Sequence, residues 1–168
     1  SGVCAANVPD GQAMWETSNS LWAAVQSGTN MVYHAAGWLE GGLVSDFAKL
    51  VLDADQLTMM NSLVAGIDVS ENGMALDALR QVGPGQHFLG SEHTQANFET
   101  AFWRSSMADY TTYEQWSSEG AQEAEARARN KAKQMLEAYQ APDIDPSIDA
   151  ALRAFIEHRK QVLPDSDY

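Results

Sequence analysis

Three aromatic side chains stand close to carboxylates along the sequence and could bind a cation. Tyr33 and Trp38 precede Glu40, and Phe88 precedes Glu92. A quaternary ammonium group has no hydrogen to donate, so proteins hold it with aromatic faces and a nearby negative charge. The alternative is that these rings fill the core, as tryptophan and tyrosine beside a strand usually do. Residue type and spacing leave both interpretations open.

Histidine and cysteine supply the next candidates. The possible zinc ligands match no closed motif in their spacing, so we expect no metal site; they are Cys4, His34, His87 and His93. His93 and Thr94 follow a glycine-rich loop and could exchange hydrogen bonds with a ligand, although a helix-capping role for Thr94 is the alternative. The sequence contains no phosphate-binding glycine loop, GxSxG elbow or HExxH motif.

The formal charge of −13 lies mostly in the first two thirds of the chain. Residues 1–103 contain two bases, Lys49 and Arg80, against eleven acids. Such a surface repels phosphate backbones, so we expect no nucleic-acid partner and favour a cationic or zwitterionic small molecule or a basic protein. Carboxylates that only keep the surface soluble are the alternative. No apolar run approaches the roughly 18 residues of a membrane-spanning helix, so we expect a cytoplasmic protein without membrane contact.

Helical periodicity covers most of the chain. The expected helices span residues 11–27, 46–65, 71–79, 91–103, 112–139 and 146–162, with Asp10, Ser45, Ser70, Thr111 and Asp145 among their N-caps. Strands are expected at Val3–Ala5 and Asn30–His34, and residues 82–86, VGPGQ, form a turn. So few strands are unusual for a complete α/β domain. The chain also lacks an initiator methionine, and we expect it to be part of a larger barrel or sheet.

Several stretches carry a resemblance to a known family. They are DGQA at 10–13, MVYHAAGWLEGGL at 31–43, KLVLD at 49–53, VAGIDV at 64–69, QVGPGQHFLGSEHT at 81–94 and GAQEAEARARNKAKQML at 120–136. In this order, along nearly the whole chain, they resemble the C-terminal part of the trimethylamine methyltransferase (MttB-like) family.

The resemblance implies an α/β fold, the C-terminal portion of a (β/α)8 TIM barrel. Residues 1–110 would form the last βα units and residues 111–168 the C-terminal helices that pack on the barrel. The implied enzyme, a homo-oligomer, passes a methyl group from a methylated amine to the Co(I) of a corrinoid (cobalamin) carried by a partner protein. Some family members contain pyrrolysine, which this chain does not show. Without it a quaternary amine such as glycine betaine is the better substrate, because it is already activated as a leaving group.

The resemblance also implies a substrate site where the barrel strands end. The residues at these ends are Tyr33, His34, Trp38 and Glu40, then Asp10 and Gln12, then His93 and Thr94. No catalytic residue is assigned. The stretch CAAN at 4–7 departs from the family pattern, which has charged or hydroxylated residues there, and so alters a pocket wall. We expect the isolated chain to be inactive, and the alternative function is a non-catalytic helical domain for oligomerisation or for docking the corrinoid protein.

Overall fold

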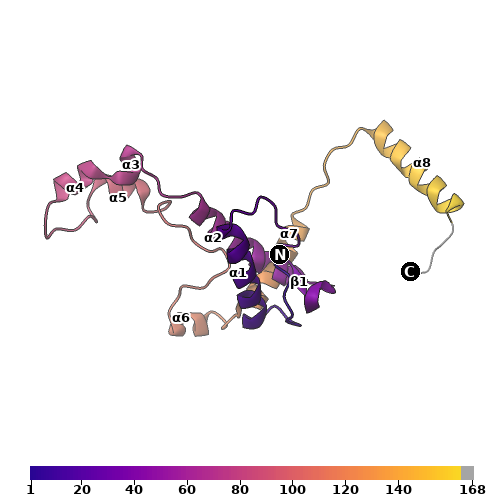
Figure 1. Ribbon diagram of the computed structural model, residues 1–168, viewed down its shortest axis with the longest axis horizontal. Coiled ribbons are helices and arrows are strands. Elements are labelled where there is room, and N and C mark those ends of the chain that lie inside the picture. The colour runs from indigo at the N-terminus through magenta and orange to yellow at the C-terminus, as the bar shows by residue number, and fades with distance from the viewer. Residues whose placement is uncertain (164–168) are drawn as a thin grey trace. The chain divides into compact units, whose positions relative to one another are not determined.

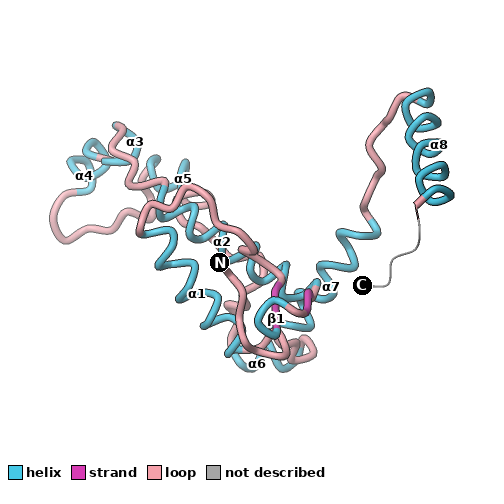
Figure 2. The backbone as a smooth tube through the Cα atoms, turned by 45° about the vertical axis from the view of Figure 1, so that its right-hand side comes forward, coloured by secondary structure: helices cyan, strands magenta, loops and turns pink. Residues whose placement is uncertain are grey.

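The computed structural model describes residues 1–163, which are mostly helical and are divided by contact into two compact units at Met135. Figure 1 labels the elements along the chain, and Figure 2 separates helices from loops. The first unit contains α1 to α6 and most of α7, and the second contains α8. The helices are α1 (Gly11–Gln26), α2 (Phe47–Val64), α3 (Glu71–Met74), α4 (Leu76–Val82), α5 (Glu92–Asn97), α6 (Tyr113–Ser118), α7 (Ala124–Glu137) and α8 (Pro146–Val162).

One antiparallel hairpin is the only sheet among the described residues. Its strands are β1 (Trp38–Leu39) and β2 (Val44–Ser45), joined by a 3-10 turn over Glu40–Gly42. Trp38 lies opposite Ser45 and Leu39 opposite Val44. The (β/α)8 barrel is therefore not visible in this chain and remains a proposal.

The strands predicted at Val3–Ala5 and Asn30–His34 are wrong. Neither segment forms a ladder, and His34 turns back with a φ of 53°. Each segment makes a single long-range backbone hydrogen bond instead: the Gly2 N–H donates to the His34 carbonyl over 2.8 Å, and the Gly41 N–H donates to the Cys4 carbonyl over 2.8 Å. The β-branched and aromatic residues that favour a strand cannot form one without a neighbouring strand to pair with.

Capping residues explain where the two best-predicted helices begin. The Asp10 carboxylate accepts from the Ala13 N–H over 3.1 Å at the start of α1, and Asp145 caps α8 ahead of Pro146, as the sequence predicts. The predicted cap of α2, Ser45, is wrong. Asp46 has this role, accepting from the Lys49 N–H over 2.8 Å, while Ser45 pairs in β2.

Three of the predicted helices are divided or end early. The helix predicted for residues 71–79 is divided into α3 and α4 by the left-handed conformation of Ala75, at φ 49°. The one predicted for 91–103 ends at Asn97, and the one predicted to reach residue 139 from Thr111 is interrupted between α6 and α7. At this second break Ala121 is left-handed and Gly120 has a φ of 100°, which most side chains disfavour.

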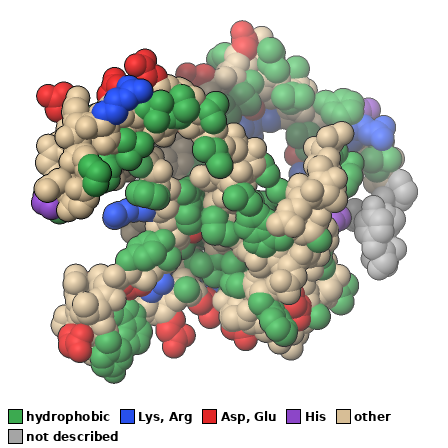
Figure 3. All heavy atoms as spheres, turned by 60° about the vertical axis from the view of Figure 1, so that its left-hand side comes forward, with side chains coloured by type: hydrophobic (Ala, Val, Ile, Leu, Met, Phe, Trp, Pro, Cys, Tyr) green, Lys and Arg blue, Asp and Glu red, His purple; other side chains and the backbone are tan. Residues whose placement is uncertain are grey.

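The core of the first unit lies where α1 packs against α2, side by side in Figures 1 and 2. One buried apolar cluster comprises Cys4, Ala6, Ala13 and Leu39. A second comprises Ala48, Leu52, Met107 and Ala128, with Met14 and Val51 against it. Much apolar surface stays uncovered, as Figure 3 shows on one face. In the part of the chain that is described, no helix combines the length and apolar content needed to cross a membrane.

The second unit is built on α8. Its apolar stripe is exposed, with Leu152 at 51% and Phe155 at 62% of full exposure. The boundary between the two units, after Met135, reflects only which residues contact each other. The predicted division of the chain by role, into barrel units up to residue 110 and packing helices after it, remains a prediction.

Candidate functional site

A buried lysine and aspartate lie between α1 and α2. Lys49 and Asp53 are one helical turn apart on α2, and both side chains are 0% exposed. The Lys49 ammonium donates to both Asp53 oxygens over 2.6 Å and to the hydroxyl of Thr17, on α1, over 2.8 Å. The Thr17 hydroxyl in turn donates to the Gly2 carbonyl over 2.8 Å. All three ammonium protons therefore have acceptors, which a buried cation requires.

The same carboxylate reaches the loop before the hairpin. Asp53 Oδ2 accepts from the Gly37 N–H over 2.9 Å, and the Gly37 carbonyl accepts from the Asp46 N–H over 3.0 Å. α2 and its cap residue therefore hold both backbone groups of Gly37. A glycine is required here, because φ is +85° and a Cβ would lie 3.3 Å from the Leu50 Cβ.

Burial dominates the electrostatics of this cluster. It raises the pKa of the Asp53 carboxyl, while the hydrogen bond from Lys49 and then the one from the Gly37 N–H act to lower that pKa. The pair is thus held together by short hydrogen bonds in a place where neither charge could remain alone.

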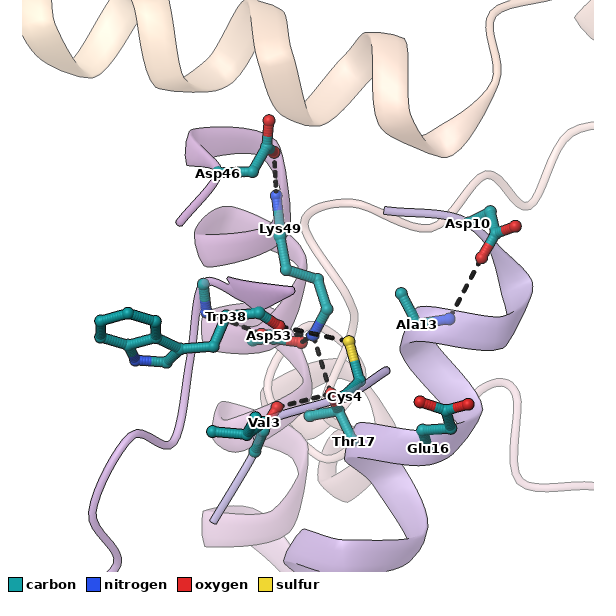
Figure 4. Close-up of polar contacts among 12 residues, drawn as sticks. Val3, Cys4, Asp10, Ala13, Glu16, Thr17, Trp38, Asp46, Lys49 and Asp53 are labelled. Carbon is teal, nitrogen blue, oxygen red and sulfur yellow. Dashed lines mark hydrogen bonds and ion pairs between the residues drawn. The ribbon is translucent and has the colours of Figure 1, made fainter. Parts of the chain in front are cut away.

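The loop presents aromatic rings to the outside. The His34 and Trp38 ring centroids are 5.2 Å apart at 83°, an edge-to-face contact, and the Tyr33 and His34 rings are 6.3 Å apart. Tyr33 and His34 are exposed and Trp38 is half-buried. Figure 4 shows the Trp38 ring pointing away from Lys49 and Asp53. The structure thus brings together three of the eight predicted site residues.

The remaining predicted residues have other surroundings. Glu40 is exposed in the turn of the hairpin, with a φ of 50°. Asp10 is the cap of α1, and the Gln12 amide donates to the Glu16 carboxylate over 2.8 Å. Glu16 also accepts from the Ala5 N–H over 2.6 Å. The side chains of Asp10 and Gln12 thus serve the local fold of the segment where α1 begins.

His93 and Thr94 belong to a different contact group. Nε2 of His93 lies 2.7 Å from the Asn72 carbonyl, which joins α5 to α3. The Thr94 N–H donates to the Ser91 hydroxyl at the start of α5, so Ser91 is the cap. A cavity of about 330 Å³ between these helices is lined by His93 with Glu92, Glu71 and Arg80. No hydrogen bond or ring contact among the described residues joins His93 or Thr94 to Trp38 or Glu40.

Metal ligands are not gathered anywhere in the described residues: no group of three histidine, cysteine or acidic side chains is placed to hold an ion. Cys4 is buried, and its thiol donates to the Trp38 carbonyl over 3.2 Å. It therefore supports the same loop that the Lys49 and Asp53 pair holds.

Comparison with known proteins agrees with the order of the motifs. A sequence model described as trimethylamine methyltransferase (MTTB) matches residues 1–164. The chain belongs to the trimethylamine methyltransferase family. It is 37% identical over 150 residues to the glycine betaine methyltransferase of Desulfitobacterium hafniense strain Y51. It is 31% identical over 156 residues to the trimethylamine methyltransferase MttB of D. hafniense strain DSM 10664 / DCB-2, and 29% identical over 154 residues to MttB2 of Methanosarcina mazei.

These alignments cover most of this chain but a smaller part of each relative. They include 89%, 93% and 90% of the chain, and 31%, 31% and 30% of the three relatives in the same order. This member of the trimethylamine methyltransferase family thus spans under a third of the length of the curated relatives it matches.

Sequence reasoning missed the three residues of the buried cluster. Lys49 and Asp53 stand within the motif KLVLD, which carries the family resemblance but gives no sign of burial. One signal was present: Lys49 is one of only two bases in residues 1–103, and it lies on the apolar side of a helix, between Ala48 and Leu52. Thr17 gave no such signal, because a hydroxyl in a helix is usually unremarkable.

Proposed function

We propose that this chain is the C-terminal part of a (β/α)8-barrel methyltransferase that takes a methyl group from a methylated amine, preferably a quaternary one, and delivers it to a corrinoid protein. The family membership supports the reaction class. The relatives named as glycine betaine and trimethylamine methyltransferases support a methylated amine as the substrate class.

The observation that carries the proposal for the substrate is the set of neighbouring rings at the surface, followed in the chain by an exposed carboxylate. Tyr33, His34 and Trp38 form consecutive ring contacts, and Glu40 follows them in the turn. Ring faces and a carboxylate attract a cation that cannot donate a hydrogen bond. The Tyr33 and Trp38 rings can each contribute about 0.5–2 kcal/mol, depending on how far water is excluded.

The two bases of residues 1–103 do not oppose the binding of a cation. Lys49 is buried against Asp53, and Arg80 donates to Asp77 over 2.8 Å. These are the two bases of residues 1–103, and each has a carboxylate partner. Arg129, which lies 3.6 Å from Asp46 near the same loop, is also paired, with Glu125 over 2.6 Å. The net negative charge of the chain favours the approach of a cation.

The chain's own residues have a binding and orienting role in this proposal. When bound to its partner protein, the reduced corrinoid supplies Co(I), a nucleophile that can take a methyl group from the amine. The exposed rings and Glu40 suit a small cation rather than a corrinoid, so we assign no residue of this chain to holding that cofactor. Holding the nitrogen fixes the direction in which a methyl group faces, and positioning of this kind contributes much of the catalysis of a group transfer.

The proposal is tested by calorimetric titration of the full-length protein that carries this chain. The ligands are trimethylamine, glycine betaine, carnitine and proline betaine, with glycine as the unmethylated control for glycine betaine. We expect saturable binding of at least one quaternary amine and none of glycine. Flat traces for all four methylated amines would overturn the proposed substrate class.

A second candidate function is favoured by one observation, the exposed apolar stripe of α8. Ile148, Leu152 and Phe155 are each at least half exposed on one side of this helix. A helical domain for oligomerisation or for docking the corrinoid protein would cover them. Light scattering of the protein and of its Phe155→Glu variant tests this function. A smaller assembly in the variant supports a role of α8 in oligomerisation. No change in mass or in methyl transfer excludes both oligomerisation and docking as roles of α8.

A further inference from the structure

We propose that Lys49 and Asp53 are positioning residues, which hold the Gly37 N–H so that the rings of His34 and Trp38 are fixed in advance for a quaternary ammonium ligand. This inference rests on the proposed function. It assigns a role to a buried pair that the resemblance and the predicted site leave without one.

The loop from His34 to Trp38 is fastened at both ends. At its start, the Gly2 N–H donates to the His34 carbonyl, and a Cβ on Gly2 would lie 2.3 Å from the Ala35 oxygen, so the two backbones touch. At its end, Asp53 and the Asp46 N–H hold Gly37. The Thr17 hydroxyl links both ends, because it donates to the Gly2 carbonyl and accepts from Lys49.

A charged pair is an expensive way to stabilise a core. Replacing a buried ion pair with apolar residues of similar size is often neutral or stabilising, because of the cost of removing both charges from water. What an apolar pair cannot do is accept a hydrogen bond from a backbone N–H. Asp53 does so for Gly37, and Lys49 keeps that carboxylate from being buried without a counter-charge. The geometry therefore points to control of the loop as the role of this pair.

The aromatic rings depend on this loop directly. Trp38 follows Gly37 in the chain, and the His34 ring meets the Trp38 ring edge to face. If the Gly37 N–H lost its acceptor, the loop would sample other directions, and the rings would have to be ordered again when a ligand binds. Such ordering weakens binding.

The test compares two double variants of the full-length protein. Lys49→Met/Asp53→Leu removes both charges and the acceptor, whereas Lys49→Met/Asp53→Asn removes both charges but keeps an oxygen that can accept from Gly37. Neither leaves a single buried charge, so both are expected to fold. Hydrogen–deuterium exchange, followed by mass spectrometry on peptides that contain Gly37, reports the loop without any ligand.

We expect the Leu variant to exchange the Gly37 amide at least about tenfold faster than wild type, since a net hydrogen bond to a charged group is lost. The Asn variant should remain closer to wild type. Titration with glycine betaine should show the same order, with a weakened Kd in the Leu variant and rescue in the Asn variant. Equal exchange in wild type and the Leu variant, or equal loss of affinity in both variants, would overturn the inference.

Two further readouts keep the test decisive. If the Leu variant does not fold, the wild-type Gly37 amide alone is informative: protection from exchange supports the inference, and exchange at the rate of an open chain contradicts it. If exchange responds as expected but wild type binds no methylated amine, the positioning of the loop stands and the proposed function fails.

Discussion

Two helices of nearly equal length differ in how far their side chains are buried. α2 has 18 residues and α8 has 17, and each begins at an aspartate cap. α2 buries five side chains, among them Leu52 and Met60, whereas α8 buries none. Each also carries an ion pair with four-residue spacing. Lys49 and Asp53 are both 0% exposed, while Arg153 and Asp149 are 76% and 41% exposed.

The difference lies in what packs against each helix. α2 meets α1, and Thr17 and Gly37 supply the hydrogen bonds that a buried charge needs. α8 belongs to the other unit, and its pair stays in water, where screening and side-chain entropy cancel most of the attraction. The same sequence spacing thus gives a structural pair in one helix and a marginal one in the other.

The largest expected difference in stability is between variants that remove the aspartate of each pair. Asp53→Ala leaves the Lys49 ammonium buried and unpaired, and should lower the free energy of unfolding by about 3–5 kcal/mol. The matched variant in α8, Asp149→Ala, should produce a change close to the error of denaturant unfolding. Similar losses in the two variants would show that burial does not separate them.

Truncating an apolar residue should also lower stability more in α2 than in α8, with a smaller difference between the two helices. Leu52 is 8% exposed, and Leu52→Ala should cost about 2–5 kcal/mol, toward the lower end where the site can collapse. Leu152 is 51% exposed, and Leu152→Ala should change the unfolding midpoint little. A large loss for Leu152→Ala would reveal a partner surface that covers α8 in solution.

The smallest effect concerns pH and the start of α1. Hydrogen bonds from the Gln12 amide and then from the Ala5 N–H lower the pKa of Glu16 below its ordinary value of 4.5. A lowered pKa means that the folded protein favours the carboxylate, so this stabilisation is present above pH 4.5 and is lost as the pH falls through the folded pKa.

Glu16→Gln tests this assignment, because glutamine keeps the size of the side chain but cannot ionise. Wild type should be more stable than the variant at neutral pH, and the two curves of unfolding free energy should converge below pH 4.5. A constant difference across the acid range would mean that the charge of Glu16 has no part in holding Ala5.

The helices could be read from the sequence where their signals are local. Asp10 and Asp145 mark the starts of α1 and α8 because a cap needs only its own helix. The strands at Val3–Ala5 and Asn30–His34 could not be judged in this way, since a strand exists only with a partner. Ala75 and Ala121 break predicted helices in a left-handed conformation for which alanine gives no warning.

The sequence could predict one part of the candidate site, the group of neighbouring rings. The nearness of Tyr33, His34 and Trp38 follows from their nearness in sequence. The Lys49, Asp53 and Thr17 cluster depends on α1 packing against α2, which brings residues 32 apart in the chain within 2.8 Å of each other. Local patterns contain no information on such a contact. Whether His93 and Thr94 share a site with Trp38 remains a prediction for the full-length protein.

The most direct measurement of the account is a calorimetric titration of the full-length protein with glycine betaine, repeated with Trp38→Leu and with the control Trp15→Leu. Trp15 is exposed, at 62%, but it lies on α1 and makes no ring contact with His34. We predict that Trp38→Leu weakens binding by about tenfold or more, within the range of a desolvated cation–π contact, and that Trp15→Leu leaves binding unchanged. Equal affinity in wild type and Trp38→Leu would contradict the assignment of this loop to the ammonium group.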